Sequence, residues 1–174
     1  MAGIPEDIKR RALAYARARS IHVNFAKELG SGKDGSVFWT MTPSAIKVFT
    51  SLDPYERELA CYQRLTERAI IDIGGHQVPQ LLNFDESLLV IEMTIVHRPF
   101  LLDFAGAYID EPPDFPEEVI DQWHADKSEQ FGARWPEVLS VVVSMRRRAG
   151  IYLLDIHQGN ITFADDPPSE QLPG

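Results

Sequence analysis

Hydrophobic and polar positions alternate between residues 25 and 49, where β-branched and aromatic side chains dominate and glycine and proline interrupt the pattern. A period of two is typical of strands that bury one face. We therefore expect three antiparallel strands in this stretch. Residues 78–84 and 88–93 have a similar composition on either side of a polar turn at 85–87. Together these runs predict a five-stranded antiparallel sheet.

Helical periodicity appears twice in the same half of the chain. A stripe of apolar residues faces several arginines within residues 5–19, which predicts a short amphipathic helix. A second helix is expected to begin at Asp53, which suits the N-cap position. Pro54 and Glu56 then suit the first and third helical positions. We expect this helix to run to about Arg68.

Beyond residue 100 the strand pattern fades and two helices are predicted, at 117–130 and 135–148. The arginines at 146–148 suit the negative end of the second helix, and Gly150 suits a left-handed cap. Residues 138–143 are unusually apolar. We expect this part of the helix to pack on its own lobe, or on a second copy of the chain, which would form a homodimer through helix 135–148.

Composition narrows the choice of partner and compartment. The chain has 174 residues, with 17 basic and 26 acidic side chains and a net charge of −9. This balance argues against nucleic acid or an anionic membrane as the partner, because both require basic residues to replace counterions. Cys61 is a lone cysteine, which favours a reducing compartment. The amino-terminal residues lack the apolar core of a secretory signal, so a cytoplasmic location is expected.

Three glycines form the pattern G-x-G-x-x-G-x-V at Gly30, Gly32, Gly35 and Val37. Glycines at this spacing let backbone N–H groups approach the oxygens of a phosphate. A dinucleotide-binding fold requires a helix directly after such a loop, whereas β-forming residues follow here. We therefore expect a flap between two antiparallel strands. The alternative is a glycine-rich hairpin without a ligand.

Lys47 lies among apolar neighbours on the strand that follows this flap, where an unpaired ammonium group would be costly. On the next helix, Glu58 lies on the face that we expect to pack inward. Glu56 is the rival partner, but its position is better suited to the helix cap. We predict that Glu58 pairs with Lys47 and holds the lysine toward phosphate groups.

Asp155 and Asn160 lie five residues apart in the segment 152–163, between the last helix and a short extended stretch. A carboxylate there can orient or deprotonate a hydroxyl nucleophile, and an amide oxygen can bind a magnesium ion that bridges phosphates. The alternative is a turn rich in Asp and Asn, since such side chains bond readily to nearby backbone.

In this order, the glycine loop, the Ala-Ile-Lys strand, the helix glutamate, a hinge and the Asp155–Asn160 loop resemble the protein-kinase-like fold. The loop form Asp-x-His-x-Gly-Asn is closer to the aminoglycoside-phosphotransferase-like small-molecule kinases than to eukaryotic protein kinases. The resemblance implies an α+β fold with a five-stranded amino-terminal lobe, one αC-type helix and a reduced, mostly helical carboxy-terminal lobe. The expected parts are a helical extension (1–24), the first lobe (25–96) and the second lobe (97–174), with its catalytic loop at 153–160.

The same resemblance implies an ATP-binding cleft between the lobes, with Mg²⁺ and a hydroxyl acceptor as further partners. The implied catalytic residues are Asp155 as the base, with Lys47 and Glu58. The implied nucleotide-binding residues are Gly30, Gly32, Gly35, Val37 and Lys47, with adenine against the backbone near Glu92 and Met93. Asn160 is the implied metal ligand.

The chain also departs from this family. Leu153 and Leu154 stand where the family usually has His and Arg, and no Asp-Phe-Gly follows Asn160. The family's main metal ligand is thus missing, and Asp165 or Asp166 is the candidate substitute.

Two functions follow from these features. One is a kinase-like ATP-binding protein that transfers the γ-phosphoryl group to a hydroxyl of a small molecule or protein. The other is an inactive pseudokinase that binds a nucleotide or a protein. The fold is expected to be truncated after the catalytic loop, and the sequence leaves open whether Gly174 is the natural end.

Overall fold

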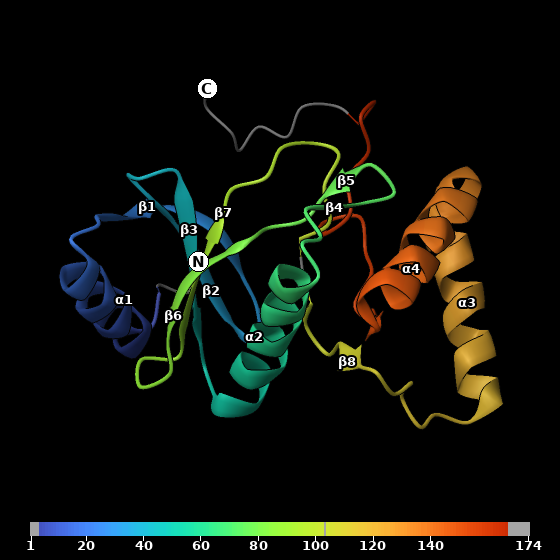
Figure 1. The fold of residues 1–174 in the computed structure, drawn as a ribbon, viewed down its shortest axis with the longest axis horizontal. Helices are drawn as coiled ribbons and strands as arrows, with labels where there is room; N and C mark the ends of the chain where they lie inside the picture. The colour runs from blue at the N-terminus through green and yellow to red at the C-terminus, as the bar shows by residue number, and fades with distance from the viewer. Residues whose placement is uncertain (1–3, 103, 167–174) are drawn as a thin grey trace.

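A five-stranded sheet forms the centre of the first half of the chain (Figure 1). The computed structural model describes residues 4–102 and 104–166, so the end at Gly174 lies outside the described residues. All neighbouring strands are antiparallel, and the predicted sheet is confirmed. In spatial order the strands are β1 (Val23–Ser31), β2 (Gly35–Thr40), β3 (Ser44–Phe49), β7 (Val90–Thr94) and β6 (Leu81–Asp85).

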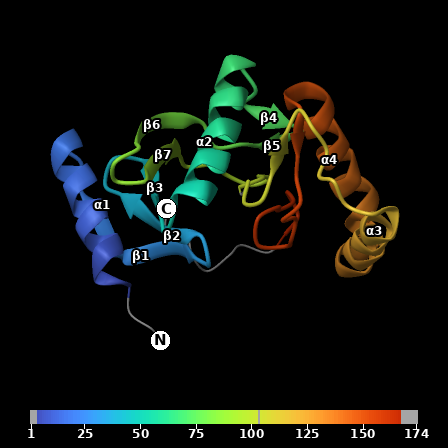
Figure 2. The same ribbon diagram turned by 90° about the horizontal axis from the view of Figure 1, so that it is seen from below.

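Two helices pack on opposite faces of this sheet (Figure 2). Helix α1 (Glu6–Arg19) packs its apolar side, including Ala12, against a cluster to which Ile46 and Val48 of β3 belong. Helix α2 (Leu52–Glu67) packs in the other core cluster, together with Ala45 and Phe49. Side chains alternate along a strand, so β3 gives one set of residues to each helix.

The start of α2 differs from the prediction. The helix begins at Leu52, so Ser51 is the N-cap residue and Asp53 lies within the first turn. The Ser51 side chain makes no capping hydrogen bond, and Asp53 still places a negative charge near the positive end of the helix dipole. The helix thus starts earlier than the sequence pattern of Asp53, Pro54 and Glu56 indicated.

A short hairpin that the sequence did not predict connects α2 to the sheet. It consists of β4 (Asp72–Ile73) and β5 (His76–Gln77), and its turn is formed by Gly74 and Gly75. Both glycines have positive φ angles, 58° and 83°, which glycine adopts without a steric penalty. Each strand has two residues, too few to produce a visible hydrophobic alternation.

The second half is mostly helical, as expected. It contains α3 (Glu117–Phe131), the 3-10 turn Gly132–Arg134 and α4 (Trp135–Ala149), and β8 (Tyr108–Ile109) pairs with β9 (Ile151–Tyr152). Gly150 ends α4 with a φ angle of 70°, so the predicted left-handed cap is confirmed. Within the described ranges, no helix is both long enough and apolar enough to cross a bilayer.

The apolar face of α4 packs within the chain. Val138, Val141 and Met145 are buried in the large core, while Val143 remains 43% exposed. Of the two expectations for this helix, packing on its own lobe is the one the structure shows. The homodimer through helix 135–148 stays a prediction, and Val143 is the exposed part of the apolar run on this helix.

Candidate active site

A cavity of about 750 Å³ lies beside the sheet and is lined by the glycine loop, β3, α2 and the loop that contains Asp155. It brings together residues that are distant in sequence. The predicted site residues that line it are Gly30, Gly32, Gly35, Val37, Lys47, Glu58, Met93, Asp155 and Asn160.

The glycine loop is a hairpin between two antiparallel strands, as predicted. The pairing of β1 and β2 extends to Ser31 and Ser36, and the N–H of Gly32 donates a 3.0 Å hydrogen bond to the carbonyl of Gly35. A Cβ atom on Gly35 would lie 2.3 Å from the carbonyl oxygen of Val48, so this position must be glycine to approach β3. A Cβ on Gly30 or Gly32 would meet no atom within 4 Å. These two glycines face open space.

Lys47 and Glu58 form the predicted ion pair. Lys47 lies in the middle of the sheet, opposite Val37 of β2 and Ile91 of β7. Its Nζ donates a hydrogen bond to Oε1 of Glu58. The side chains are only 10% and 1% exposed. Buried charges persist when they are paired, so the pair holds an ammonium group at the wall of the cavity.

The residues near the predicted adenine contact divide between the two faces of the sheet. Met93 lines the cavity, and its Sδ accepts a 3.1 Å hydrogen bond from the hydroxyl of Tyr62, a lining residue that sequence reasoning missed. Glu92 points to the other face, where its carboxylate accepts hydrogen bonds from Tyr15 (2.9 Å) and Ser44 (2.7 Å).

The backbone near the predicted adenine contact belongs to the sheet. Glu92 and Met93 lie between β3 and β6 and are in register with residues of both strands. Residues 94–96 follow the strand and line the cavity, and sequence reasoning did not single them out. The adenine contact near Glu92 and Met93 stays a prediction.

The Asp155 loop is closed by Asn160. The amide oxygen of Asn160 accepts a 2.9 Å hydrogen bond from the N–H of His157, and its Nδ2 donates to the carbonyl of Asp155. Asn160 is 3% exposed, whereas Asp155 is exposed at the cavity. The turn-forming alternative thus holds for Asn160, while the Asp155 carboxylate remains accessible to a ligand.

The proposed substitute metal ligands lie elsewhere. Asp165 pairs with Arg134, whose guanidinium lowers the pKa of that carboxyl. The carboxylate of Asp166 accepts a 2.7 Å hydrogen bond from the N–H of Phe163. Neither is among the described residues that line the larger cavity. The prediction that Asp165 or Asp166 replaces the missing ligand stays a prediction, and in this structure both carboxylates have partners within the chain.

The fit of a magnesium ion was tested on the residues themselves. In the described part of the chain, no group of three His, Cys, Asp or Glu side chains is arranged to hold a metal. Asn160 lines the cavity, but its amide oxygen already accepts a hydrogen bond from His157. The described residues therefore do not fit a protein-built Mg²⁺ site.

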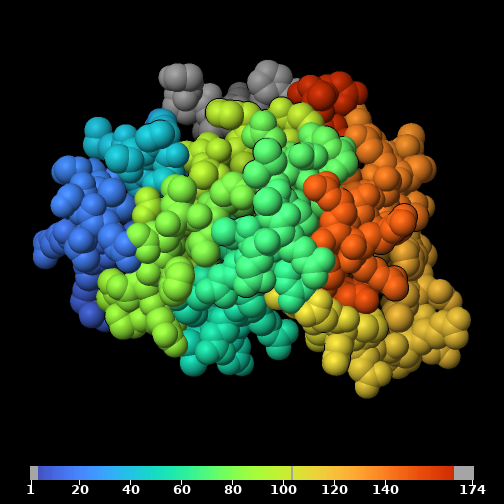
Figure 3. Space-filling model, viewed as in Figure 1, coloured from blue at the N-terminus to red at the C-terminus, as the bar shows by residue number. Residues whose placement is uncertain are grey.

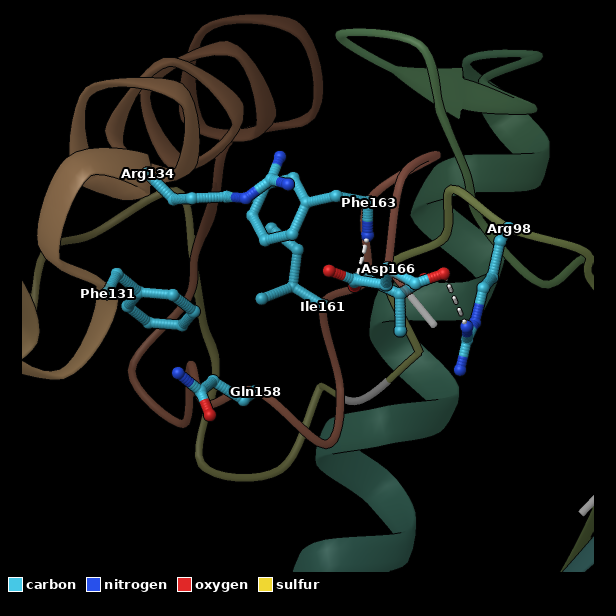
Figure 4. Close-up of a pocket in the computed structure, with 8 residues that line it drawn as sticks. Arg98, Phe131, Arg134, Gln158, Ile161, Phe163 and Asp166 are labelled. Atoms are coloured by element: carbon cyan, nitrogen blue, oxygen red, sulfur yellow. Dashed lines mark hydrogen bonds between the residues drawn. The ribbon is translucent and has the colours of Figure 1, made fainter. Parts of the chain in front are cut away.

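A smaller cavity of about 330 Å³ adjoins the larger one and shares Arg98, Gln158 and Thr162 with it (Figure 4). Arg98 donates a 3.3 Å hydrogen bond to the carbonyl of Asp166 across this cavity. Arg134 lies over the ring of Phe163, 4.3 Å from its centre. Sequence reasoning did not indicate that these arginines would lie near the site.

Comparison with known proteins gave structural likenesses only. No family model and no curated protein sequence matches the chain. The solved structures that it resembles include the streptomycin–ATP–APH(2″)-IIa ternary complex, with 14% identity and a TM-score of 0.41. A gentamicin–APH(2″)-IIa complex has 13% identity and a TM-score of 0.46. The aminoglycoside phosphotransferase APH(2″)-Ib, bound to ADP, has 14% identity and a TM-score of 0.37.

These likenesses cover 83%, 84% and 68% of this chain, respectively. They cover 42%, 41% and 36% of the solved chains, so this chain spans about two fifths of the length of those proteins or less. With TM-scores below 0.5, the likenesses add no weight to a function. The proposals below depend on the geometry of the cavity.

Proposed function

We propose that the chain binds ATP in the larger cavity and positions its γ-phosphoryl group for transfer to a hydroxyl. The observation that carries this proposal is the buried Lys47–Glu58 pair at the cavity wall, beneath a glycine loop with two open positions. A lysine held by a carboxylate presents a fixed positive charge, and the backbone N–H groups of a glycine loop are suited to phosphate oxygens.

The sides of the cavity supply complementary chemistry. Val37, Ala45 and Met93 give an apolar surface that suits a flat base, and the backbone of residues 94–96 follows the sheet at the same wall. Asp155 lies in the same cavity as Lys47. In the proposed reaction its carboxylate accepts the proton of the acceptor hydroxyl as the oxygen attacks the γ-phosphorus. The bond from that phosphorus to the bridging oxygen breaks, and ADP leaves.

The second candidate is a module that binds nucleotide without turnover, that is, a pseudokinase. The placement of Asp165 and Asp166 favours it, because both carboxylates are engaged outside the larger cavity. Both candidates require nucleotide binding at Lys47. They differ in whether ADP is produced.

Isothermal titration with ATP, with and without Mg²⁺, tests the shared step. We expect binding by the unaltered chain and by Lys127→Met, a matched control on α3, and no binding by Lys47→Met. Because Lys47→Met removes one member of a buried ion pair, the double variant Lys47→Met/Glu58→Leu is measured beside it. ATP affinity that survives in a folded double variant would contradict the proposed site. ADP release in the presence of hydroxyl-bearing acceptors then separates the enzyme from the pseudokinase.

A further inference from the structure

Two tyrosines on the short β8–β9 ribbon each lie beneath an arginine from a different helix. Tyr108 and Tyr152 are register partners across the ribbon. The guanidinium of Arg57, on α2, lies 5.7 Å from the centre of the Tyr108 ring, and that of Arg146, on α4, lies 5.1 Å from the centre of the Tyr152 ring. The ribbon thus joins two arginines that are 89 positions apart in the sequence into one surface.

The same surface continues along α2 to the end of α4. Residues 57 and 64 are seven positions apart and share one stripe of α2, and Arg68, the residue that follows the helix, is four positions further along. Arg68 donates to the carbonyl of Arg148, and Arg148 donates to the carbonyl of Asp72. Figure 3 shows α2, the end of α4 and the segment around β8 meeting on one face of the molecule. We call this the arginine surface, defined by Arg57, Arg68, Tyr108, Arg146, Arg148 and Tyr152.

The arginines of this surface form no ion pairs among the described residues. Asp110 and Glu67 lie beside the surface, and both pair with Arg64, Asp110 at 2.7 Å and Glu67 at 3.9 Å. Within residues 4–102 and 104–166, none of the four arginines of the surface has a carboxylate within 4.0 Å. Four exposed guanidinium groups therefore gather on a chain whose net charge is −9.

Helix ends explain only part of this arrangement. Arginines in a last turn are favourable because they face the negative end of the helix dipole. This accounts for Arg146 and Arg148, in the last turn of α4, and for Arg68, which directly follows α2. It does not account for Arg57, which lies in the second turn of α2, nearer to its positive end. Arg57 is instead placed over a tyrosine ring, in line with Arg146.

We propose that the arginine surface docks an acidic segment of a partner protein. Guanidinium groups bind carboxylates in a two-pronged geometry, and arginine with tyrosine is the composition that is enriched where protein interfaces concentrate their binding energy. Nucleic acids and anionic membranes carry negative charge over an area much larger than this patch. The acidic remainder of the chain, with its net charge of −9, would therefore repel them. A short acidic peptide can contact the patch without approaching the acidic remainder of the molecule.

Fluorescence anisotropy of a labelled peptide of eight glutamates, with the full chain, tests this proposal. We expect saturable binding that weakens between 50 and 500 mM salt. Arg57→Glu/Arg146→Glu should weaken it by a factor of ten or more. Arg10→Glu/Arg17→Glu, on exposed positions of α1, makes the same change in charge and should leave the affinity within about twofold of the unaltered chain. Circular dichroism establishes that both variants are folded.

Three results would overturn the proposal. The first is an absence of peptide binding at 50 mM salt. The second is an equal loss of affinity in the α1 control variant, which would mean that only net charge matters. The third is tighter binding of an oligothymidylate of matched charge, or of phosphatidylglycerol vesicles, than of the peptide. The milder variant Arg57→Gln/Arg146→Gln replaces the charge reversal if the latter does not fold.

Discussion

Glu58 of α2, whose side chain is 1% exposed, accepts a hydrogen bond from Lys47 of β3, so the two opposite charges lie in contact in a buried position. The two residues are eleven positions apart and belong to consecutive elements. Removing one partner of a buried ion pair costs far more than replacing both by apolar residues, because the remaining charge is left without compensation. This asymmetry separates the stabilising role of the pair from its proposed role in binding.

We expect Lys47→Met to lower the free energy of unfolding by about 3–5 kcal/mol, and Lys47→Met/Glu58→Leu to recover most of that loss. Urea unfolding followed by tryptophan fluorescence measures both values. ATP binding should be absent from both variants, since each lacks the ammonium group. A double variant that is no more stable than Lys47→Met would show that Glu58 is not the group left uncompensated.

The three glycines of the loop should differ in their tolerance of alanine. Gly35→Ala places a Cβ 2.3 Å from the carbonyl oxygen of Val48, so the sheet must shift and stability should fall by about 1–3 kcal/mol. Gly32→Ala meets no atom within 4 Å and is the matched control. We expect Gly32→Ala to fold normally and to bind ATP more weakly. Equal melting temperatures for the two variants would be inconsistent with the close approach at Gly35.

Tyr55 allows a test of how a buried hydroxyl group affects the free energy of unfolding and its dependence on pH. Within the described residues its buried hydroxyl has no hydrogen-bond partner. Burial raises its pKa from 10.0 to about 12. A raised pKa favours the protonated form in the folded state, so this contribution to stability is present below pH 10 and is lost as the pH rises toward 12.

Tyr55→Phe should therefore increase the free energy of unfolding by on the order of 1 kcal/mol at pH 7. It should also reduce the loss of stability above pH 10. Burial raises the pKa of the Cys61 thiol to about 12, but this thiol is present in both proteins and cancels in the comparison. Tyr108→Phe, at a half-buried tyrosine, is the control. Urea midpoints from pH 7 to 11 provide the measurement, and parallel curves for Tyr55→Phe and the unaltered chain would refute the assignment.

Variants of Asp155 and Asn160 should separate an effect on phosphoryl transfer from an effect on stability. Asp155→Asn changes an exposed side chain, so stability should stay within about 0.5 kcal/mol of the unaltered chain. ATP binding should persist, while transfer to a hydroxyl should fall by about 10²-fold or more. Asn160→Ala removes two hydrogen bonds from a buried position and should cost about 1–3 kcal/mol. Unchanged ADP production by Asp155→Asn, in a chain that turns over, would remove Asp155 from the proposed reaction.

Local patterns predicted the features that depend on neighbouring residues. The alternation around Lys47 indicated β3, and the helical spacing of Glu58 indicated which face of α2 packs inward. Those two directions were sufficient to predict the ion pair. The glycine pattern followed by β-forming residues likewise predicted the hairpin, because turn and strand preferences act over a few positions.

The features that the sequence did not predict depend on contacts between distant segments. Glu92 faces α1 because Tyr15 and Ser44 offer hydroxyl groups on that side of the sheet. Asp165 pairs with Arg134, 31 positions earlier, and nothing in the surrounding pattern indicates that contact. The β4–β5 hairpin is too short to show periodicity. The positions of Glu92 and Asp165 were thus decided by tertiary partners, whereas the hairpin was missed because of its length.

Alternate residues of β3 pack against α1 and against α2, so helices on both faces of the sheet fix the position of the strand that carries Lys47. Ile46 and Val48 anchor it in the cluster with α1, while the lysine between them reaches the other layer. The position of the Lys47 ammonium group therefore depends on the packing of β3 against both α1 and α2. A substitution on α1 that shifts its packing, such as one at Ala12, would therefore move the Lys47 ammonium group at the cavity wall without contacting it.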